Sequence, residues 1–480
     1  MSAIGLVQGS RAGKEAKQEP ESEQEADSEP HQRKWVALVS VPVLLGNADD
    51  DRAQAMALGT DVQLDLKDPP LPSYLVLHPR VSPNPRSNEE PLSAYILAAD
   101  RSGYILLQVV EGNRPDFFLC DTHSRTVTII PPVCSYLRTG LDIDIRPNLS
   151  IGLIADPLQG HYVVAQLHPA TLHRYRLLCY STAKREWNVR YLTRQEDHLM
   201  INTSIDNAVL AHNGCLWWIA LGYGIFFCDP VTPVLELAEL RFLPFPAGCQ
   251  MNAYASLCPK HLKQRRCVRP SEGKLRFVEI RGFYCNVDWS IRYDDVLFEP
   301  TVRMWTLEDP ERPDPWTLEY EVPLADIWNN ETYANARLPP GEVPQVALVD
   351  PNNHCVVYFF QGSKLFGFDM QNKQVIACKK CLIDRNKVIM FQSSRPIVDA
   401  WELSSPPPFM LSEDDGDLSS EDIVFPRGKK RRVCKFVHSW TSSRPVVGRT
   451  WKIASPPPDA SSHTSGDQAD DAPSSPKGAE

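Results

Sequence analysis

The chain has 480 residues, of which 42% are hydrophobic and 23% charged, so its composition allows a large buried core and excludes a wholly disordered protein. Its net charge of −10 argues against a surface that coats nucleic acid or an anionic membrane over its whole extent. No apolar stretch approaches the roughly 20 residues that a membrane helix needs, so we predict no membrane span.

The first 34 residues are rich in Gln, Glu, Ser and Lys and contain no apolar signal region. Such a segment cannot bury enough surface to offset its chain entropy, so we predict a disordered leader over residues 1–34. The 13 cysteines are an odd number in a chain with no predicted secretion signal, which favours reduced thiols. This pattern predicts a protein of the nucleus, the cytoplasm or both.

Short runs of Val, Ile, Leu and aromatic residues follow, separated by Pro, Gly, Asn and Asp, and this alternation predicts strands and turns. The runs repeat as pairs of hairpins whose third strands end near Asp121, Ser181, Asp229, Thr306 and Asp369. We therefore predict an all-β fold over residues 35–403, a β-propeller-like domain of about five to six four-stranded blades. A sixth blade would pair a strand near residues 35–42 or 59–66 with one near residues 387–401.

Several segments of this region, in order, resemble a grass-expanded plant family known as domain of unknown function 1618. They are WVALVSVPVLL, VQLDLKDPPLPSYLVLHP, LWWIALGYGIFFCDPVTPVLELAELRFLPFP, WTLEYEVPLADIW and RLPPGEVPQVALVDPNNHCVVYF. The most specific positions, which we interpret as structural, are Trp217, Trp218, Cys228, Asp229 and Pro230. The resemblance implies a plant protein with a propeller-like domain and no established activity.

The same pattern is similar to F-box-associated propellers, which present substrates to ubiquitin ligases. The chain shows no Leu-Pro-led helical F-box segment ahead of Trp35, and this difference argues against a ligase adaptor.

Motifs for nucleophilic or phosphate chemistry are missing from the sequence, which has no G-x-S-x-G elbow, P-loop or G-x-G-x-x-G. We interpret Gly222-Tyr-Gly224 as a tight hairpin turn and Asp294-Asp295 as solvated charge. We therefore assign no catalytic residue, no cofactor-binding residue and no cofactor.

Two groups of cysteines have spacings that could suit zinc. Cys378 and Cys381 form a C-x-x-C pair, but an odd offset on a strand would send the two side chains to opposite faces. A looser group has irregular spacing: Cys249, Cys258, His261 and Cys267. We predict no metal site at either group.

Two further features could form binding surfaces. One is a set of tryptophans that we expect mostly in the core between blades: Trp187, Trp217, Trp218, Trp305, Trp316 and Trp328. The other is a predicted loop over residues 258–273 that could dock an acidic partner or simply be solvated; its cations are Lys260, Lys263, Arg265, Arg266 and Arg269.

Residues 404–480 alternate acidic, basic and Ser/Pro-rich stretches, so we predict a disordered tail. Within it, an uninterrupted basic cluster predicts a nuclear-localisation signal that binds importin: Lys429, Lys430, Arg431 and Arg432. The same cluster could instead contact nucleic acid. Ser419 and Ser420 precede acidic residues and are candidate phosphorylation sites.

The sequence thus favours a non-enzymatic protein–protein interaction module whose propeller-like domain offers a loop-lined face to another protein. Two alternatives stay open. One is a glycan-binding or hydrolytic propeller enzyme with its site at the channel mouth, and the other is a nuclear factor that binds nucleic acid through its basic tail.

Overall fold

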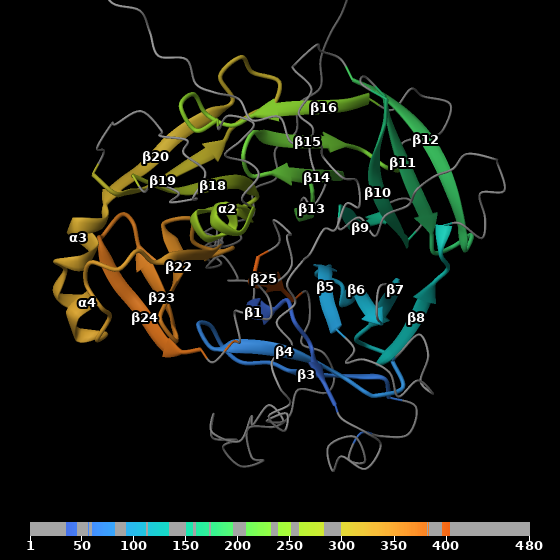
Figure 1. Cartoon of the computed structure of the whole chain (residues 1–480), viewed down its shortest axis with the longest axis horizontal. Coiled ribbons are helices and arrows are strands. Elements are labelled where there is room, and N and C mark those ends of the chain that lie inside the picture. Colours follow the sequence, from blue (N-terminus) through green and yellow to red (C-terminus); the bar gives the residue numbers. More distant parts are fainter. Residues whose placement is uncertain are drawn as a thin grey trace, which may run out of the picture. The chain divides into compact units, whose positions relative to one another are not determined.

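The computed structural model describes residues 35–45, 60–81, 93–111, 114–133, 150–156, 160–171, 174–194, 208–231, 239–250, 259–282, 299–381 and 396–403, with the isolated residues 56 and 383. All of these belong to one compact unit, which ends at Asp417. Within it, strands dominate and the few helices are short (Figure 1).

The strands of the described ranges form five sheets, one of which joins two blades, and together they make up blades 1 to 6. Blade 1 contains β25 (Val398–Glu402), β1 (Trp35–Val39), β4 (Pro72–Leu77) and β3 (Val62–Asp65), with β2 (Val43–Leu44) on the edge of β4 beyond β1. Blade 2 contains β5 (Ser93–Ala99), β6 (Tyr104–Glu111), β7 (Arg114–Asp121) and β8 (Thr126–Ile130). Blade 3 contains β9 (Ile151–Asp156), β10 (His161–Thr171), β11 (Arg174–Ser181) and β12 (Glu186–Arg194).

The other three blades repeat the antiparallel order of blades 2 and 3. Blade 4 contains β13 (Ala208–His212), β14 (Cys215–Ala220), β15 (Gly224–Cys228) and β16 (Glu239–Pro244). Blade 5 contains β17 (Arg266–Ser271), β18 (Lys274–Arg281), β19 (Thr301–Leu307) and β20 (Trp316–Pro323). Blade 6 contains β21 (Gln345–Val349), β22 (Val356–Gln361), β23 (Lys364–Asp369) and β24 (Gln374–Lys380). A short parallel pairing of β12 with β16 joins blades 3 and 4 at their outer edges.

Six buried apolar clusters lie between successive blades, one at each junction. Their members come from blades 1 and 2, 2 and 3, 3 and 4, 4 and 5, 5 and 6, and finally 6 and 1. Both faces of each sheet are therefore buried, which explains why strands such as β15 and β22 are apolar at nearly every position instead of alternating. The blades form a closed ring around their innermost strands (Figure 1).

The ring is closed by a pairing between the two ends of the domain. Strand β25 runs antiparallel to β1, with Trp35 opposite Glu402 and Val39 opposite Val398. The indole of Trp401 donates from Nε1 to the backbone carbonyl of Asp100 in blade 2 at 2.9 Å. The predicted all-β propeller is confirmed, with six blades in the described residues and with the sixth blade completed by the pairing expected from the sequence.

The turns between third and fourth strands share one geometry in blades 2, 3 and 6. An Asp or Ser at the end of the third strand accepts backbone N–H groups of the turn, as Asp121 does from His123 and Asp369 does from Gln371. The last turn residue then has a positive φ in each case, at Arg125, Arg185 and Lys373. These turns keep the outer hairpins short.

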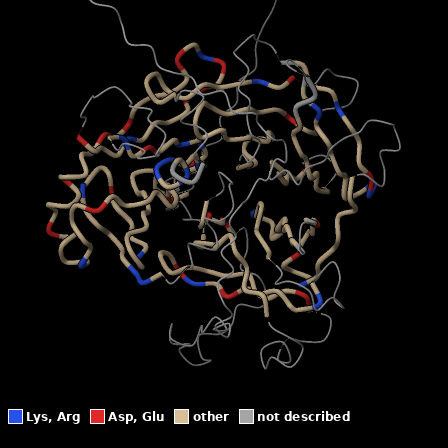
Figure 2. Tube along the Cα trace, in the orientation of Figure 1, with Lys and Arg blue, Asp and Glu red and all other residues tan. Residues whose placement is uncertain are grey.

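Charged residues lie mostly along the outer strands and in the turns (Figure 2). The segment around residues 258–273 is an exception and corrects a prediction. It is not a loop, because Pro259–Arg265 forms helix α2 and Arg266–Ser271 forms the innermost strand β17. Arg266 is buried against Glu279 and donates to the carbonyl of Leu221 at 2.8 Å, so it joins blades 5 and 4.

Lys263 and Arg269 are also buried. The exposed basic surface that we expected on this segment is therefore not formed by these side chains. The physical reason is that Arg266 and Arg269 lie on the strand nearest the centre of the ring, where their charges are matched by neighbouring carboxylates.

Helices α3 (Leu324–Trp328) and α4 (Glu331–Asn335) cover blades 5 and 6 with Leu324, Ile327 and Tyr333.

Candidate functional site

The turns between first and second strands meet at one end of the ring, and we call this end the inner-turn face. In blades 4 and 5 these turns are two-residue hairpins, Asn213-Gly214 and Glu272-Gly273, with positive φ at both residues. Such hairpins match the twist of the flanking strands and hold the strand ends close together. In blade 2 the turn runs from Asp100 to Gly103, and in blade 6 it spans residues 350–355.

A cavity of about 850 Å³ lies among the innermost strands and opens toward this face. Its walls are largely apolar and come from β5, β9 and β13, through residues such as Leu97, Ile154 and Val209. Its rim carries polar groups of the inner turns, among them Ser102 and His212. An apolar cavity of this size with a few converging polar groups is the usual form of a binding site.

The blade 2 side of the rim is a connected polar cluster. The carboxylate of Asp100 accepts from the backbone N–H of Ser102 at 2.9 Å and from the hydroxyl of Tyr162 at 3.2 Å. The Ser102 and Tyr162 hydroxyls also contact each other. Burial raises the pKa of Tyr162 to about 12, so its hydroxyl stays protonated at neutral pH. These contacts fix the rim between blades 2 and 3.

A charged pair lies on the opposite wall of the cavity. The buried guanidinium of Arg269 on β17 is 3.1 Å from the half-exposed carboxylate of Asp399 on β25. Arg269 also donates to the carbonyl of Val268 at 2.7 Å. On the rim beyond blade 3, burial lowers the pKa of His212, so this imidazole is neutral at pH 7.

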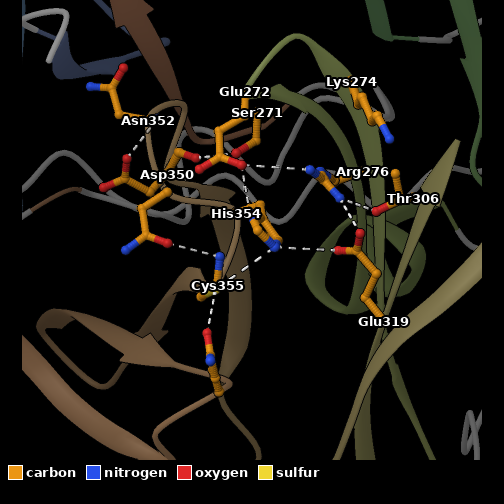
Figure 3. A network of polar contacts seen from close by, with 12 residues as sticks. Ser271, Glu272, Lys274, Arg276, Thr306, Glu319, Asp350, Asn352, His354 and Cys355 are labelled. Carbon is orange, nitrogen blue, oxygen red and sulfur yellow. Dashed lines mark hydrogen bonds and ion pairs between the residues drawn. The ribbon is translucent and has the colours of Figure 1, made fainter. Parts of the chain in front are cut away.

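Beside the cavity, the inner turns of blades 5 and 6 carry a second polar network (Figure 3). His354 lies between two carboxylates of blade 5, with Nδ1 at 2.6 Å from Glu272 and Nε2 at 3.8 Å from Glu319. Arg276 balances both acids, at 3.9 Å from Glu272 and 2.6 Å from Glu319. Figure 3 shows the imidazole of His354 pointing from the blade 6 turn toward these groups.

Cys355 follows His354 and extends the same network. Its sulfur is 3.8 Å from Nε2 of His354, 3.1 Å from the hydroxyl of Tyr320 and 3.2 Å from Oε1 of Gln371, to which the thiol donates. The residue itself is only 9% exposed, whereas the His354 side chain is 27% exposed. The arrangement places a sulfur, an imidazole and a carboxylate in sequence at the edge of the inner-turn face.

The residues singled out by the family resemblance lie inside the ring. Trp217 and Trp218 are neighbours on β14 and point to opposite faces of blade 4, where both are buried. Trp218 donates from Nε1 to the carbonyl of Ser150, the residue just before β9 of blade 3, at 2.9 Å. Cys228 ends β15 in the core, and Asp229 accepts from the backbone N–H of Val231 at 2.7 Å just after it.

The other predicted tryptophans are mostly core residues as well. Trp187, Trp305 and Trp316 are at most 7% exposed. Trp187 and Trp316 each donate to a backbone carbonyl at the end of the preceding blade, at 2.7 and 2.9 Å. Trp328 is partly buried against the cluster between blades 5 and 6. These rings pack between blades and form no aromatic surface patch.

The two cysteine groups are separated in space where the structure describes them. Cys378 packs toward the cluster between blades 5 and 6, whereas Cys381 belongs to the cluster between blades 6 and 1. This is the result that strand alternation predicts for an odd offset. Cys249 and Cys267 likewise belong to different clusters, while Cys258 and the side chain of His261 lie outside the described residues.

The remaining predicted sites lie outside the described ranges. They concern the nuclear-localisation candidate Lys429–Arg432, the phosphorylation candidates Ser419 and Ser420, and the acidic pair Asp294-Asp295. Gly222-Tyr-Gly224 is described, and it is the predicted turn: residues 221–223 join β14 to β15, with Ala220 opposite Gly224.

Sequence reasoning missed the polar groups of the inner-turn face. His354 and Glu272 are 82 positions apart, and no local motif connects them. The adjacent His354 and Cys355 were the available signal, because a His next to a Cys in a predicted inner turn places two reactive side chains at the strand ends. The cavity-lining Asp100 and Tyr162 gave no such signal.

The family described as protein of unknown function DUF1618 matches residues 218–358. The match supports the predicted resemblance over these residues. The match runs from Trp218 through blades 4 and 5 to Tyr358 of blade 6, and so includes Cys228, Asp229 and both Glu272 and His354. The resemblance expected from the sequence is confirmed there, while the segments before residue 218 lie outside the match.

Solved structures give distant similarities. The WD40 domain of SCAP from fission yeast is 8% identical, with a TM-score of 0.27. It covers 61% of this chain, and the Cps50 domain named next covers 59%. The β-propeller domain of Cps50 (Swd1) from Myceliophteria thermophila is 8% identical with a TM-score of 0.26, and apo AztD from Citrobacter koseri is 12% identical with 0.25 and covers 58% of this chain. The chain covers 57%, 86% and 57% of these three proteins, respectively.

No curated protein matches the sequence. Among the helices of the described ranges, none has the length and apolar character to span a membrane. The fold assignment rests on the sheet order and the closed set of junctions within the chain itself.

Proposed function

We propose that this protein is a non-enzymatic binding module that holds a segment of another protein at the inner-turn face. The observation that carries the proposal is the cavity of about 850 Å³, because turns from several blades converge on its rim. A binding surface made of turns on a rigid ring of sheets is a common solution in proteins, since the scaffold fixes the positions of the loops.

The chemistry of the cavity favours a peptide segment as the occupant. Its apolar walls suit aliphatic side chains, and charged residues of both signs line it, among them Arg101, Arg269 and Asp399. The rim carboxylate of Asp100 is held in place by hydrogen bonds from Ser102 and Tyr162. The alternative function for the same cavity is the binding or hydrolysis of a glycan.

The first test blocks the cavity with a single large side chain. Ala211 is exposed and lines the cavity, so Ala211→Trp should reduce retention of protein partners from native tissue by about tenfold or more in affinity capture, because hot-spot contacts at a binding site contribute about 2 kcal/mol or more.

The matched control is Ala183→Trp. Ala183 is equally an exposed alanine, but it lies in the turn between β11 and β12 and does not line the cavity. Unchanged capture by Ala211→Trp, or equal loss with both variants, would contradict the proposal. Partners retained by the wild type and by Ala183→Trp, but not by Ala211→Trp, would support it.

Nuclear import through the basic cluster at 429–432, contact of that cluster with nucleic acid and a plant origin stay predictions from the sequence. They concern residues outside the described ranges or the resemblance itself, and the binding proposal does not depend on them.

A further inference from the structure

The network between blades 5 and 6 contains an ordered set of groups that the binding proposal does not use. A sulfur, an imidazole and a carboxylate follow one another: Cys355 Sγ lies 3.8 Å from His354 Nε2, and His354 Nδ1 lies 2.6 Å from Glu272 Oε2 (Figure 3). A nucleophile next to a base that is itself oriented by a third group is the arrangement that activates thiols in proteins.

The short contact with Glu272 determines which nitrogen of the imidazole can act as a base. A carboxylate accepts hydrogen bonds, so Nδ1 of His354 carries the hydrogen that it donates to Glu272. Nε2 then keeps its lone pair and faces the sulfur of Cys355. The carboxylate also stabilises the positive charge that appears on the ring when Nε2 takes the thiol proton.

Two further groups lie close to the sulfur or to the imidazole. The hydroxyl of Tyr320 lies 3.1 Å from Sγ and 3.5 Å from Nε2. Burial, together with the neighbouring thiol and acids, holds the pKa of Tyr320 above its usual range, so the hydroxyl stays protonated and can donate to sulfur. Glu319, 3.8 Å from Nε2, adds a second carboxylate beside the ring.

The backbone holds the two turns against each other. Glu272 has a positive φ of 49°, its N–H donates to the carbonyl of Pro351 at 2.8 Å, and the hydroxyl of Ser271 donates to the carbonyl of Asp350 at 2.5 Å. The N–H of Cys355 donates to Asn353 at 3.1 Å. A carboxylate from one blade is thus fixed on the imidazole of the next.

Four other described cysteines differ from Cys355 in their surroundings. Burial raises the pKa of the thiols of Cys120, Cys179 and Cys228, which lie deep in the ring. Burial also raises the pKa of Cys378, which is more exposed than Cys355 and lies on the outermost strand of the same blade. Cys378 is therefore an internal reference that is more accessible but has no imidazole among its charged neighbours.

We propose that Cys355 is a reactive thiol, activated by His354 and Glu272, and that it is a modification site for peroxides. His354 Nε2 takes the thiol proton, and the sulfur then attacks one oxygen of hydrogen peroxide. The S–O bond forms as the O–O bond breaks, so sulfur is oxidised by two electrons to the sulfenic acid and peroxide is reduced. The leaving hydroxide takes the proton from His354 and departs as water, which restores the neutral imidazole.

The test measures sulfenic acid at individual cysteines of the native full-length chain. The protein is exposed to dilute hydrogen peroxide at pH 7, the product is trapped with dimedone, and peptides with Cys355 and Cys378 are quantified by mass spectrometry. We expect Cys355 to react at least about tenfold faster than Cys378, although it is less exposed. Equal reactivity, or faster reaction of Cys378, would overturn the proposal.

Three variants separate activation from simple exposure. His354→Gln and Glu272→Gln should each slow the oxidation of Cys355 by at least about tenfold and leave Cys378 unchanged, whereas Glu272→Asp should restore part of the rate. A rate at Cys355 that does not respond to either change would refute the role of these residues. If the His354→Gln protein were unfolded, the buried Cys267 would be labelled. In that case Glu272→Gln, which lies in an exposed two-residue turn, tests whether the network activates Cys355.

Discussion

At the scale of single residues, His168 makes the stability of the ring depend on pH. This imidazole lies on β10 and is 8% exposed, and burial with the nearby charge of Arg176 lowers its pKa to about 4. An unfolded chain would protonate it near pH 6.5. Between these values the unfolded state binds more protons than the folded one, so the unfolding free energy falls as the pH decreases from about 6.5 to 4.

A direct comparison of wild type and His168→Gln tests this dependence. The wild type should lose about 2 kcal/mol more unfolding free energy than the variant between pH 7 and pH 4.5, as measured by urea denaturation. Above pH 7 the two pH profiles should run parallel. Identical profiles at low pH would show that His168 titrates normally in the folded protein.

Residue chemistry also shows what the sequence could predict. Buried tryptophans such as Trp218 were expected between blades, because large rings fill the space between sheets, and they lie there. The ion pair of Arg266 with Glu279 was not foreseen, because a cationic run in a sequence indicates solvated charge unless its strand is known to be central. The burial of a charge depends on partners that local sequence does not reveal.

At the scale of elements, the domain is closed by the antiparallel pairing of β1 with β25, two strands that lie far apart in the sequence. Ala37 of β1 and Ala400 of β25 are directly opposite each other, so their Cβ atoms should lie within about 5.5 Å. In Ala37→Cys with Ala400→Cys, mild oxidation should form a cross-link that peptide mapping detects. The cross-link should also raise the unfolding temperature, because it closes a very long loop.

The control shifts one partner by a single residue. In Ala37→Cys with Asp399→Cys, the second side chain points to the other face of the sheet, so the cross-link should form poorly. If both pairs cross-link equally, the register of β25 is wrong and the sixth blade is not closed in this way.

The strand pattern was more predictable than the turns. Third strands ending at Asp121, Ser181 and Asp369 followed from the alternation of apolar runs and turn residues. The left-handed residues Arg125 and Lys373 did not, because only glycine or asparagine usually signals a positive φ. The inner strand β17 was mistaken for a loop, because its cations hide the apolar pattern of a central strand.

At the scale of the whole molecule, the site depends on closure of the ring. The cavity is lined by strands that range in sequence from Leu38 to Glu402, so none of its walls exists before the blades assemble. This is also why the sequence predicted a loop-lined face but not its residues. Repeats indicate how many turns meet, whereas the side chains that face one another depend on the closed geometry.

The most direct measurement places a photo-activated cross-linking amino acid in the full-length chain at one position at a time. Asn213 is an exposed inner-turn residue at the cavity, Lys184 is exposed in an outer turn, and Lys430 belongs to the basic cluster. The account predicts that adducts with a partner protein form from position 213 and not from position 184. Adducts that form only from position 430 or 184 would contradict it, because the partner would then be held away from the cavity.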